Sequence, residues 1–262
     1  MATETVVLAP GAFCWVDLGT TDPAAARKFF GELFGWTATE HPMPGGQTYA
    51  MMEKDGRKVA GIMLLPEQAR QMGAPPHWLS HVYVKSAQET ARKVRELGGK
   101  VLLEPMDCMG AGTMAVLQDP QGAVFGAWQP ATELDTNTAY NQPGALCWNE
   151  LWTSDTGAAT GFYTGLFGWK PDPQDFGGMK YTVVKNGERP NGGIMASPGE
   201  GVPPNWVVYF AVANCDATVS KATGLGAKVL APAMGIPTVG RFAVLADPQG
   251  AAFAVIQPEK QG

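Results

Sequence analysis

The sequence predicts an α+β protein that contains four copies of a β-α-β-β-β module. Three observations support this prediction: the chain repeats itself, each repeat contains two capped helices, and short strands with alternating polarity separate the helices. A repeat of roughly 120 residues that occurs only twice indicates duplicated domains rather than a solenoid. A chain of 262 residues is also long enough for about two domains.

The repeat is clearest at the start of each copy. Residues 10–36 and 143–169 are identical at 15 of 27 positions, and Asp-Pro-Gln-Gly-Ala occurs at 119–123 and again at 247–251. We therefore predict one domain at 10–130 and a second at 143–258. The polar segment 131–142 is then the linker between them.

The predicted elements of the first copy follow in order. Residues 12–19 are β-prone, and Asp22-Pro23 is a helix start signal for a helix that ends at Gly35. Ser86 and Glu89 form a capping box for a second helix. Strands are predicted at 36–40, 47–53, 58–64, 78–84, 101–103, 113–118 and 123–129.

Composition excludes several classes of protein. The net charge is −5 and no run of basic residues occurs, so neither a nucleic acid nor a membrane surface is an expected partner. No apolar run is long enough to span a bilayer, and the N-terminus lacks a basic signal-peptide region. The four cysteines form no C-x-x-C pair, and we interpret Cys14 and Cys147 as buried apolar residues in a reducing compartment. We therefore expect a cytoplasmic protein, as a monomer or a homodimer.

The motifs TDPAAARKFFGELFGW and DPQGAVFGAWQP, with their counterparts in the second copy, resemble the vicinal oxygen chelate superfamily. This superfamily includes glyoxalase I, bleomycin-resistance proteins and extradiol dioxygenases. The resemblance covers about residues 10–258. It implies that paired modules form two curved eight-stranded mixed sheets, each enclosing a cavity, with helices on the outside.

Metal enzymes of this superfamily take one ligand from the first strand and one from the last strand of each module. The resemblance places the first-strand positions at Trp15, Leu79, Trp148 and Val207, and the last-strand positions near Ile62 and Ile194 and at Gly126 and Ala254. None of these side chains is a ligand for a divalent metal. We therefore predict no metal and no cofactor; a metal enzyme with displaced ligands is the less favoured interpretation.

Strand alternation indicates which side chains face each cavity. Phe13, Trp15 and Asp17 share one face of the first strand, opposite the apolar Cys14, Val16 and Leu18. The candidate acid/base residues are Asp17, His81 and Glu150. The candidate ligand-binding residues are Trp15, Tyr83, Trp148, Trp152 and Tyr209.

Each candidate also has an ordinary structural interpretation. A buried acid is often satisfied by backbone amides, a buried histidine by a neighbour, and an indole often only fills space. The leading hypothesis is a metal-independent protein that binds a small apolar or aromatic metabolite, with acid/base catalysis of an isomerase, lyase or hydroxylase type. The alternative is a binding protein that sequesters a drug or metabolite without catalysis.

Overall fold

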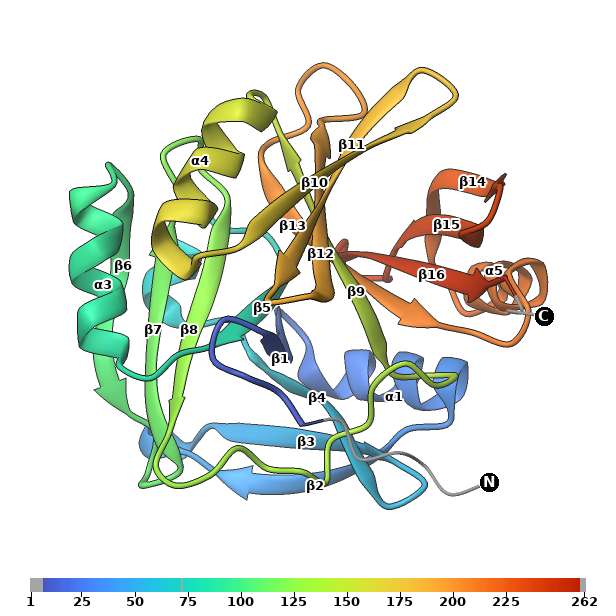
Figure 1. The fold of residues 1–262 in the computed structure, drawn as a ribbon. Helices are drawn as coiled ribbons and strands as arrows, with labels where there is room; N and C mark the ends of the chain where they lie inside the picture. Colours follow the sequence, from blue (N-terminus) through green and yellow to red (C-terminus); the bar gives the residue numbers. More distant parts are fainter. Residues whose placement is uncertain (1–6, 72, 260–262) are drawn as a thin grey trace. The chain divides into compact units, whose positions relative to one another are not determined.

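The computed structural model describes residues 7–71 and 73–259, and within them the predicted α+β architecture is confirmed (Figure 1). The strands form two eight-stranded mixed sheets, with the orders β2-β3-β4-β1-β5-β8-β7-β6 and β10-β11-β12-β9-β13-β16-β15-β14. The second order repeats the first with each number raised by eight. The two sequence copies therefore have the same strand topology.

The elements of the first copy match the predicted order closely. Two elements were not predicted, α2 and a short 3-10 turn at Pro44–Gly46, and β6 is longer than predicted. The bounds are β1 Phe13–Thr20, α1 Pro23–Phe34, β2 Thr37–Pro42, β3 Thr48–Lys54, β4 Arg57–Leu64, α2 Glu67–Gln71, β5 His77–Tyr83, α3 Ala87–Glu96, β6 Lys100–Asp107, β7 Gly112–Gln118 and β8 Val124–Pro130.

The second copy repeats this series. Its elements are β9 Leu146–Thr153, α4 Thr156–Phe167, β10 Lys170–Phe176, β11 Met179–Asn186, β12 Arg189–Ala196, β13 Asn205–Ala211, α5 Cys215–Gly224, β14 Lys228–Ile236, β15 Gly240–Ala246 and β16 Ala252–Pro258. No helix among the described residues is long and apolar enough to cross a membrane.

The chain forms two compact units, and each unit combines modules from both sequence copies. The first unit contains the chain up to Trp15, Leu79–Thr136 and Trp148–Val207; the second contains Val16–Trp78, Asn137–Cys147 and the chain from Val208 onward. The second and third modules thus make one unit, and the first and fourth make the other. That residues 10–130 and 143–258 are the two domains of the protein remains a prediction from the sequence.

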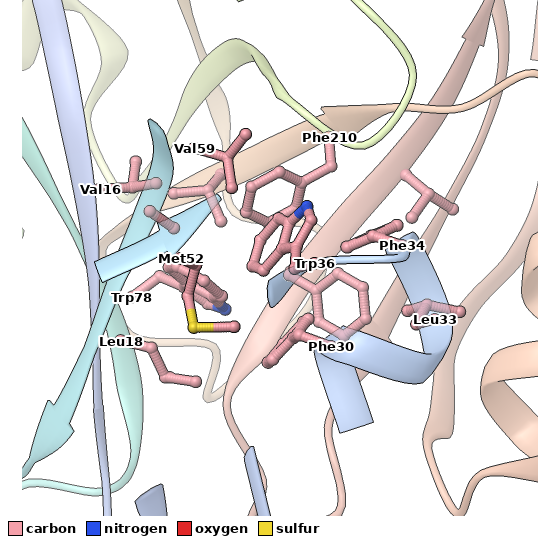
Figure 2. Packing of buried hydrophobic residues seen from close by; sticks show 14 of the residues in the cluster. Val16, Leu18, Phe30, Leu33, Phe34, Trp36, Met52, Val59, Trp78 and Phe210 are labelled. Carbon is pink, nitrogen blue, oxygen red and sulfur yellow. The ribbon is translucent and has the colours of Figure 1, made fainter. Parts of the chain in front are cut away.

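The second unit is built around the aromatic face of α1. Phe30 and Trp36 stack with ring centroids 5.5 Å apart, and Phe210 lies 5.4 Å from Trp36 (Figure 2). Val16 and Leu18 of β1 are fully buried in the same core. Burying residues of this size is the main driving force for forming such a unit.

The first unit has an equivalent core beneath α3 and α4. Tyr163 and Trp169 stack at 5.5 Å, and Phe125 packs against Tyr163 at the same centroid distance. Phe13 belongs to this core, where its ring lies 4.9 Å from Trp206. Phe13 is the first residue of β1, where the chain enters from the turn at Gly11, so the strand face that it shares with Trp15 and Asp17 begins in a packed core.

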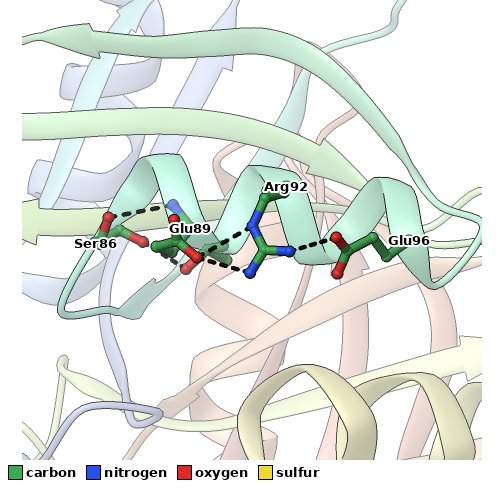
Figure 3. A network of polar contacts seen from close by, with 5 residues as sticks. Ser86, Glu89, Arg92 and Glu96 are labelled. Carbon is green, nitrogen blue, oxygen red and sulfur yellow. Dashed lines mark hydrogen bonds and ion pairs between the residues drawn. The ribbon is translucent and has the colours of Figure 1, made fainter.

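Helix ends and turns show the predicted capping chemistry. Asp22 accepts a hydrogen bond from the backbone N–H of Ala25 at 2.9 Å, and Gly35 adopts the left-handed conformation that ends α1. On α3, Ser86 caps the first turn, and Arg92 contacts Glu89 and Glu96 on the exposed face (Figure 3). Such exposed ion pairs contribute little to stability.

The repeated motifs have direct structural roles. The indole of Trp36 donates to the carbonyl of Gly144 at 2.7 Å, and the indole of Trp169 donates to the carbonyl of Gly11 at the same distance. In each compact unit, the Phe-Gly-Trp motif of one copy therefore holds the Pro-Gly-Ala motif of the other copy. Two separate sequence signals are explained by one recurring contact.

The predicted linker is ordered along part of its length. The backbone N–H of Lys58 donates to the carbonyl of Asn137 at 2.9 Å, and Ala139 is fully buried in the core of the second unit. Of the two cysteines expected to be buried, Cys14 is buried, whereas Cys147 is only half-buried when its backbone and side chain are taken together. Desolvation of its thiol raises the pKa of Cys147 to about 12, so this thiol stays protonated at neutral pH.

Candidate functional site

Asp17 lies in the second unit, on the face of β1 that points away from α1. Its neighbours Val16 and Leu18 enter the helical core, so alternation directs Asp17 to the opposite face, as predicted. The residue is 5% exposed, and its Oδ1 accepts a hydrogen bond of 2.6 Å from the hydroxyl of Tyr49. Such a short bond to a carboxylate is typical of charge-assisted hydrogen bonding.

A glycine makes room for this contact. Asp17 is the register partner of Gly61 on the parallel neighbour β4. A Cβ atom added to Gly61 would overlap both the Tyr49 hydroxyl and the Asp17 carboxylate. The absence of a side chain at Gly61 is therefore a condition for the Asp17–Tyr49 pair.

The first unit contains an equivalent arrangement around Glu150. Glu150 is the register partner of Gly193, and the ring and hydroxyl of Tyr181 occupy the space that a Cβ on Gly193 would take. The Glu150 Oε1 accepts from the indole N–H of Trp152 at 2.8 Å, and the Tyr181 hydroxyl accepts from the indole N–H of Trp148 at 2.8 Å. Trp148 and Trp152, two of the three predicted tryptophans, therefore contact this group of polar side chains.

The environment of Tyr181 disfavours its ionised form. Burial, followed by the charge of Glu150 and a hydrogen bond to it, raises the pKa of Tyr181 well above its ordinary value. The hydroxyl therefore keeps its proton at neutral pH and acts as a hydrogen-bond donor to Glu150. An indole, a phenol and a carboxylate form a continuous hydrogen-bonded chain.

Of the remaining predicted residues, Trp15 lies on β1 and is half-buried, and the others lie on β5 and β13. His81 belongs to the first unit, is 2% exposed and is the register partner of Gly126, whose added Cβ would overlap the imidazole. Tyr83 is half-buried in the same unit. Tyr209 belongs to the second unit and is buried, with the ring of Phe242 at 6.2 Å. Asp17 and His81 thus belong to different compact units.

Strand register corrects the predicted metal-ligand alignment. Gly126 lies opposite His81 rather than Leu79, and Ala254 lies opposite Tyr209 rather than Val207. The residues in register with the predicted last-strand positions are therefore two positions later than the predicted first-strand positions. A shift of two residues preserves the strand face, which is why alternation alone could not reveal it.

The corrected positions do not fit the ligand pattern that the resemblance implies. Asp17, His81 and Glu150 are capable donors, but the last-strand partners, Gly61, Gly126, Gly193 and Ala254, carry no donor atom. Aromatic or imidazole rings fill the space above the three glycines. Among residues 7–71 and 73–259, no group of three or more His, Cys, Asp or Glu side chains could hold a metal ion.

Sequence reasoning missed Tyr49 and Tyr181, the partners of the two carboxylates. A signal for them exists, because Gly-Ile-Met occurs at 61–63 and again at 193–195, and a tyrosine precedes each motif by 12 residues. The hairpin register brings each tyrosine opposite the methionine of the motif. Comparing strand pairs between copies, rather than single strands, would have found both residues.

Fold and sequence together define the class of the protein as the vicinal oxygen chelate superfamily. The chain belongs to the glyoxalase-like domain family, whose model matches residues 14–127 and 146–256. It is 42% identical over 249 residues to a Mycobacterium tuberculosis (strain CDC 1551 / Oshkosh) protein named "Putative glyoxylase CFP32", covering 94% of this chain and 95% of that protein. It is 36% identical over 260 residues to the "Anthracycline biosynthesis protein DnrV" of Streptomyces peucetius, covering 95% and 94%.

Solved structures support the same fold. The Mn(II)-bound glyoxalase from Novosphingobium aromaticivorans is 15% identical with a TM-score of 0.63, covering 97% of this chain and 86% of that one. The 2,2',3-trihydroxybiphenyl 1,2-dioxygenase from Sphingomonas wittichii strain RW1 is 14% identical with a TM-score of 0.62, covering 95% and 91%. At these identities the likeness concerns the fold and not the chemistry.

Proposed function

We propose that this protein binds a small apolar or aromatic metabolite beside its carboxylate–tyrosine pairs, and that it does so without a metal. The observation that carries the proposal is the 2.6 Å hydrogen bond from Tyr49 to the buried Asp17. The recurrence of a tyrosine beside Glu150 supports it, because the carboxylate has changed from Asp to Glu while the tyrosine and the glycine beneath it are the same.

The pair is suited to acid/base catalysis. A carboxylate held in place by a tyrosine can remove a proton from a bound ligand, and the phenol can donate a hydrogen bond where negative charge develops. Asp17 is the proposed base in the second unit, with Tyr49 as its partner. His81 is a proposed acid/base group in the first unit. Trp15 and Tyr83 are proposed to contact the ligand.

The choice of aromatic ligands has support from a relative. DnrV is named for anthracycline biosynthesis, and anthracyclines are polycyclic aromatic compounds. Indole and phenol rings present faces on which such molecules stack. Polycyclic phenols and quinones are therefore the first compounds to test with this chain.

A second candidate function is sequestration of a cationic compound, and the Glu150 group favours it. Trp148, Trp152 and Tyr181 are joined by hydrogen bonds to one another or to this carboxylate, and Phe176 packs against Tyr181 at 5.9 Å. A carboxylate among aromatic rings is a favourable setting for an organic cation. In this reading, Glu150, Trp148 and Trp152 bind the ligand and no reaction follows.

Two matched variants separate these functions. A thermal-shift screen of the whole protein against polycyclic phenols, quinones, dicarbonyls and organic amines first identifies a ligand, because a native-state ligand raises stability. Asp17→Asn should then abolish turnover while binding persists, and Glu150→Gln should weaken binding of amines. Unchanged turnover in Asp17→Asn would refute the acid/base role. Stoichiometric Ni, Zn, Mn or Fe in active protein, lost together with activity on chelation, would refute metal independence.

The remaining expectations belong to the same proposal. A cytoplasmic location, a monomeric or homodimeric state and function without a cofactor are all compatible with a small-molecule binder. Fractionation of cells, sedimentation of the purified protein and mass spectrometry under native conditions test them in turn.

A further inference from the structure

The hairpin formed by β6 and β7 carries an unusual concentration of sulfur. Met106, Cys108, Met109 and Met114 lie within nine consecutive residues, all in the first compact unit. The carboxylate–tyrosine pairs do not use any of them. Met106 is 47% exposed and Met109 is 62% exposed, so thioethers at the hairpin end are accessible to solvent.

Strand register places three of these sulfur-bearing residues on one face. Met106 and Met114 are direct cross-strand partners, and such residues project to the same side with Cβ atoms about 5 Å apart. The backbone N–H of Cys108 donates to the carbonyl of Gly112 at 2.8 Å, which continues the ladder, so Cys108 follows Met106 on that side. The Cys108 thiol also lies 4.0 Å from the carbonyl oxygen of Met106.

This face is the one turned away from α3. Ala115 and Leu117 are fully buried in the helical core, which directs Met114 to the opposite side of β7. Trp128 is the register partner of Met114 on β8, and a Cβ on Gly112 would lie 2.8 Å from its Cζ2 atom. The indole therefore covers the backbone at Gly112, opposite Cys108.

We propose that Met106, Cys108 and Met114 bind a soft, thiophilic monovalent cation of the Cu(I) type. One thiolate and two thioethers form a donor set that selects such ions over hard divalent metals. Met109, at the turn with a φ of 52°, is an adaptable fourth sulfur at the solvent side. On binding, the thiol S–H bond breaks, its proton goes to solvent and a sulfur–metal bond forms, with no change of oxidation state.

The second copy provides a control within the same chain. Its equivalent hairpin, formed by β14 and β15, carries Met234 opposite Phe242, and Ile236 where the first copy has Cys108. The same backbone arrangement therefore exists with a single sulfur. The double variant Cys108→Ile/Met114→Phe installs the side chains that the β14–β15 hairpin carries at these positions.

Titration of the whole protein with Ag(I), a redox-inert soft cation, tests the proposal by native mass spectrometry and chelator competition. We expect one Ag(I) per chain in the wild type, and Cu(I) should bind equally under anaerobic conditions. Loss of an outer partner alone weakens metal sites by about 10–100-fold, so the double variant should lose more than that. Met234→Leu should bind like the wild type.

Absence of stoichiometric Ag(I) in the wild type would overturn the proposal, as would equal affinity in the double variant. Equal affinity would assign the metal to other cysteines and leave the hairpin methionines as an apolar surface. If the double variant unfolds, as judged by circular dichroism, the single variant Cys108→Ser at the hairpin end decides the question by the same titration.

Discussion

Replacing Phe30 by Tyr should stabilise the protein, because a hydroxyl at this position would satisfy two buried polar atoms at once. In the first unit the equivalent residue is Tyr163, whose hydroxyl accepts from the indole of Trp206 at 2.8 Å and donates to Asp119 Oδ2 at 3.2 Å. In the second unit the corresponding residues are Phe30, Trp78 and Asp247. Among the described residues, Trp78 Nε1 and Asp247 Oδ2 are buried without a hydrogen-bond partner.

The ring geometry at Phe30 matches that at Tyr163, which carries the hydroxyl. The rings of Phe30 and Trp78 have centroids 5.3 Å apart at 81°, compared with 5.2 Å and 81° for Tyr163 and Trp206. Each hydrogen bond contributes about 0.5–1.5 kcal/mol, so two of them give about 1–3 kcal/mol. Each kcal/mol raises the melting temperature of a domain of this size by about 2–4 °C.

Urea unfolding followed by tryptophan fluorescence, together with thermal melting, measures this effect. Tyr163→Phe is the matched control, and it should destabilise the protein by about 2–6 kcal/mol because it leaves two buried groups unpaired at about 1–3 kcal/mol each. A Phe30→Tyr protein that is no more stable than the wild type, while Tyr163→Phe is destabilised, would refute the inference that the second unit has room for the hydroxyl.

Three further predictions concern pH, a tyrosine and folding. Burial raises the pKa of Asp119 and Asp247 in the folded protein. The ionised carboxylates therefore destabilise the fold fully above the raised pKa, and this effect is lost as the pH falls through that pKa. Asp247→Asn should be more stable than the wild type at neutral pH and lose that advantage in acid, as measured by urea unfolding across pH. Glu150→Gln should lower the pKa of Tyr181, since the carboxylate charge is one cause of its rise, and an ultraviolet titration that finds no change would contradict the pairing. A chain ending at residue 130 should fail to form a folded monomer, because the core around α1 takes aromatic residues from the second copy; a cooperative unfolding transition in a monomeric species by sedimentation and circular dichroism would contradict this.

The sequence was sufficient to predict the architecture because its signals are local and occur twice. Asp22 and Ser86 mark helix starts through single capping contacts, and the glycine after α1 marks its end. Asp119 begins a turn in which one carboxylate oxygen accepts from three backbone amides, so the Asp-Pro-Gln-Gly motif determines its own conformation. Each of these residues acts within a few positions of itself.

The compact units could not be predicted in the same way. Alternation correctly identified the face that Asp17 occupies, yet it contained no information on which strand pairs with which residue, so Tyr49 was missed. The exchange of modules between copies depends on contacts separated by more than a hundred residues, such as Trp36 with Gly144. Nothing local in the sequence distinguishes a module that packs within its own copy from one that packs with the other.

Differences between the copies show how a duplicated core acquires distinct pairings. In the first unit the hydroxyl of Ser80 donates to the side chain of Asn149 at 2.6 Å, with both residues buried. The equivalent positions in the second unit are Val208 and Val16, both fully buried in the apolar core. A buried polar group facing an apolar one would lose its hydrogen bond, which costs about 1–3 kcal/mol. The Ser80–Asn149 pair therefore favours packing of the second module with the third, and the two valines favour packing of the first module with the fourth. Modules packed in other combinations would be less stable, although their scaffold sequences are alike.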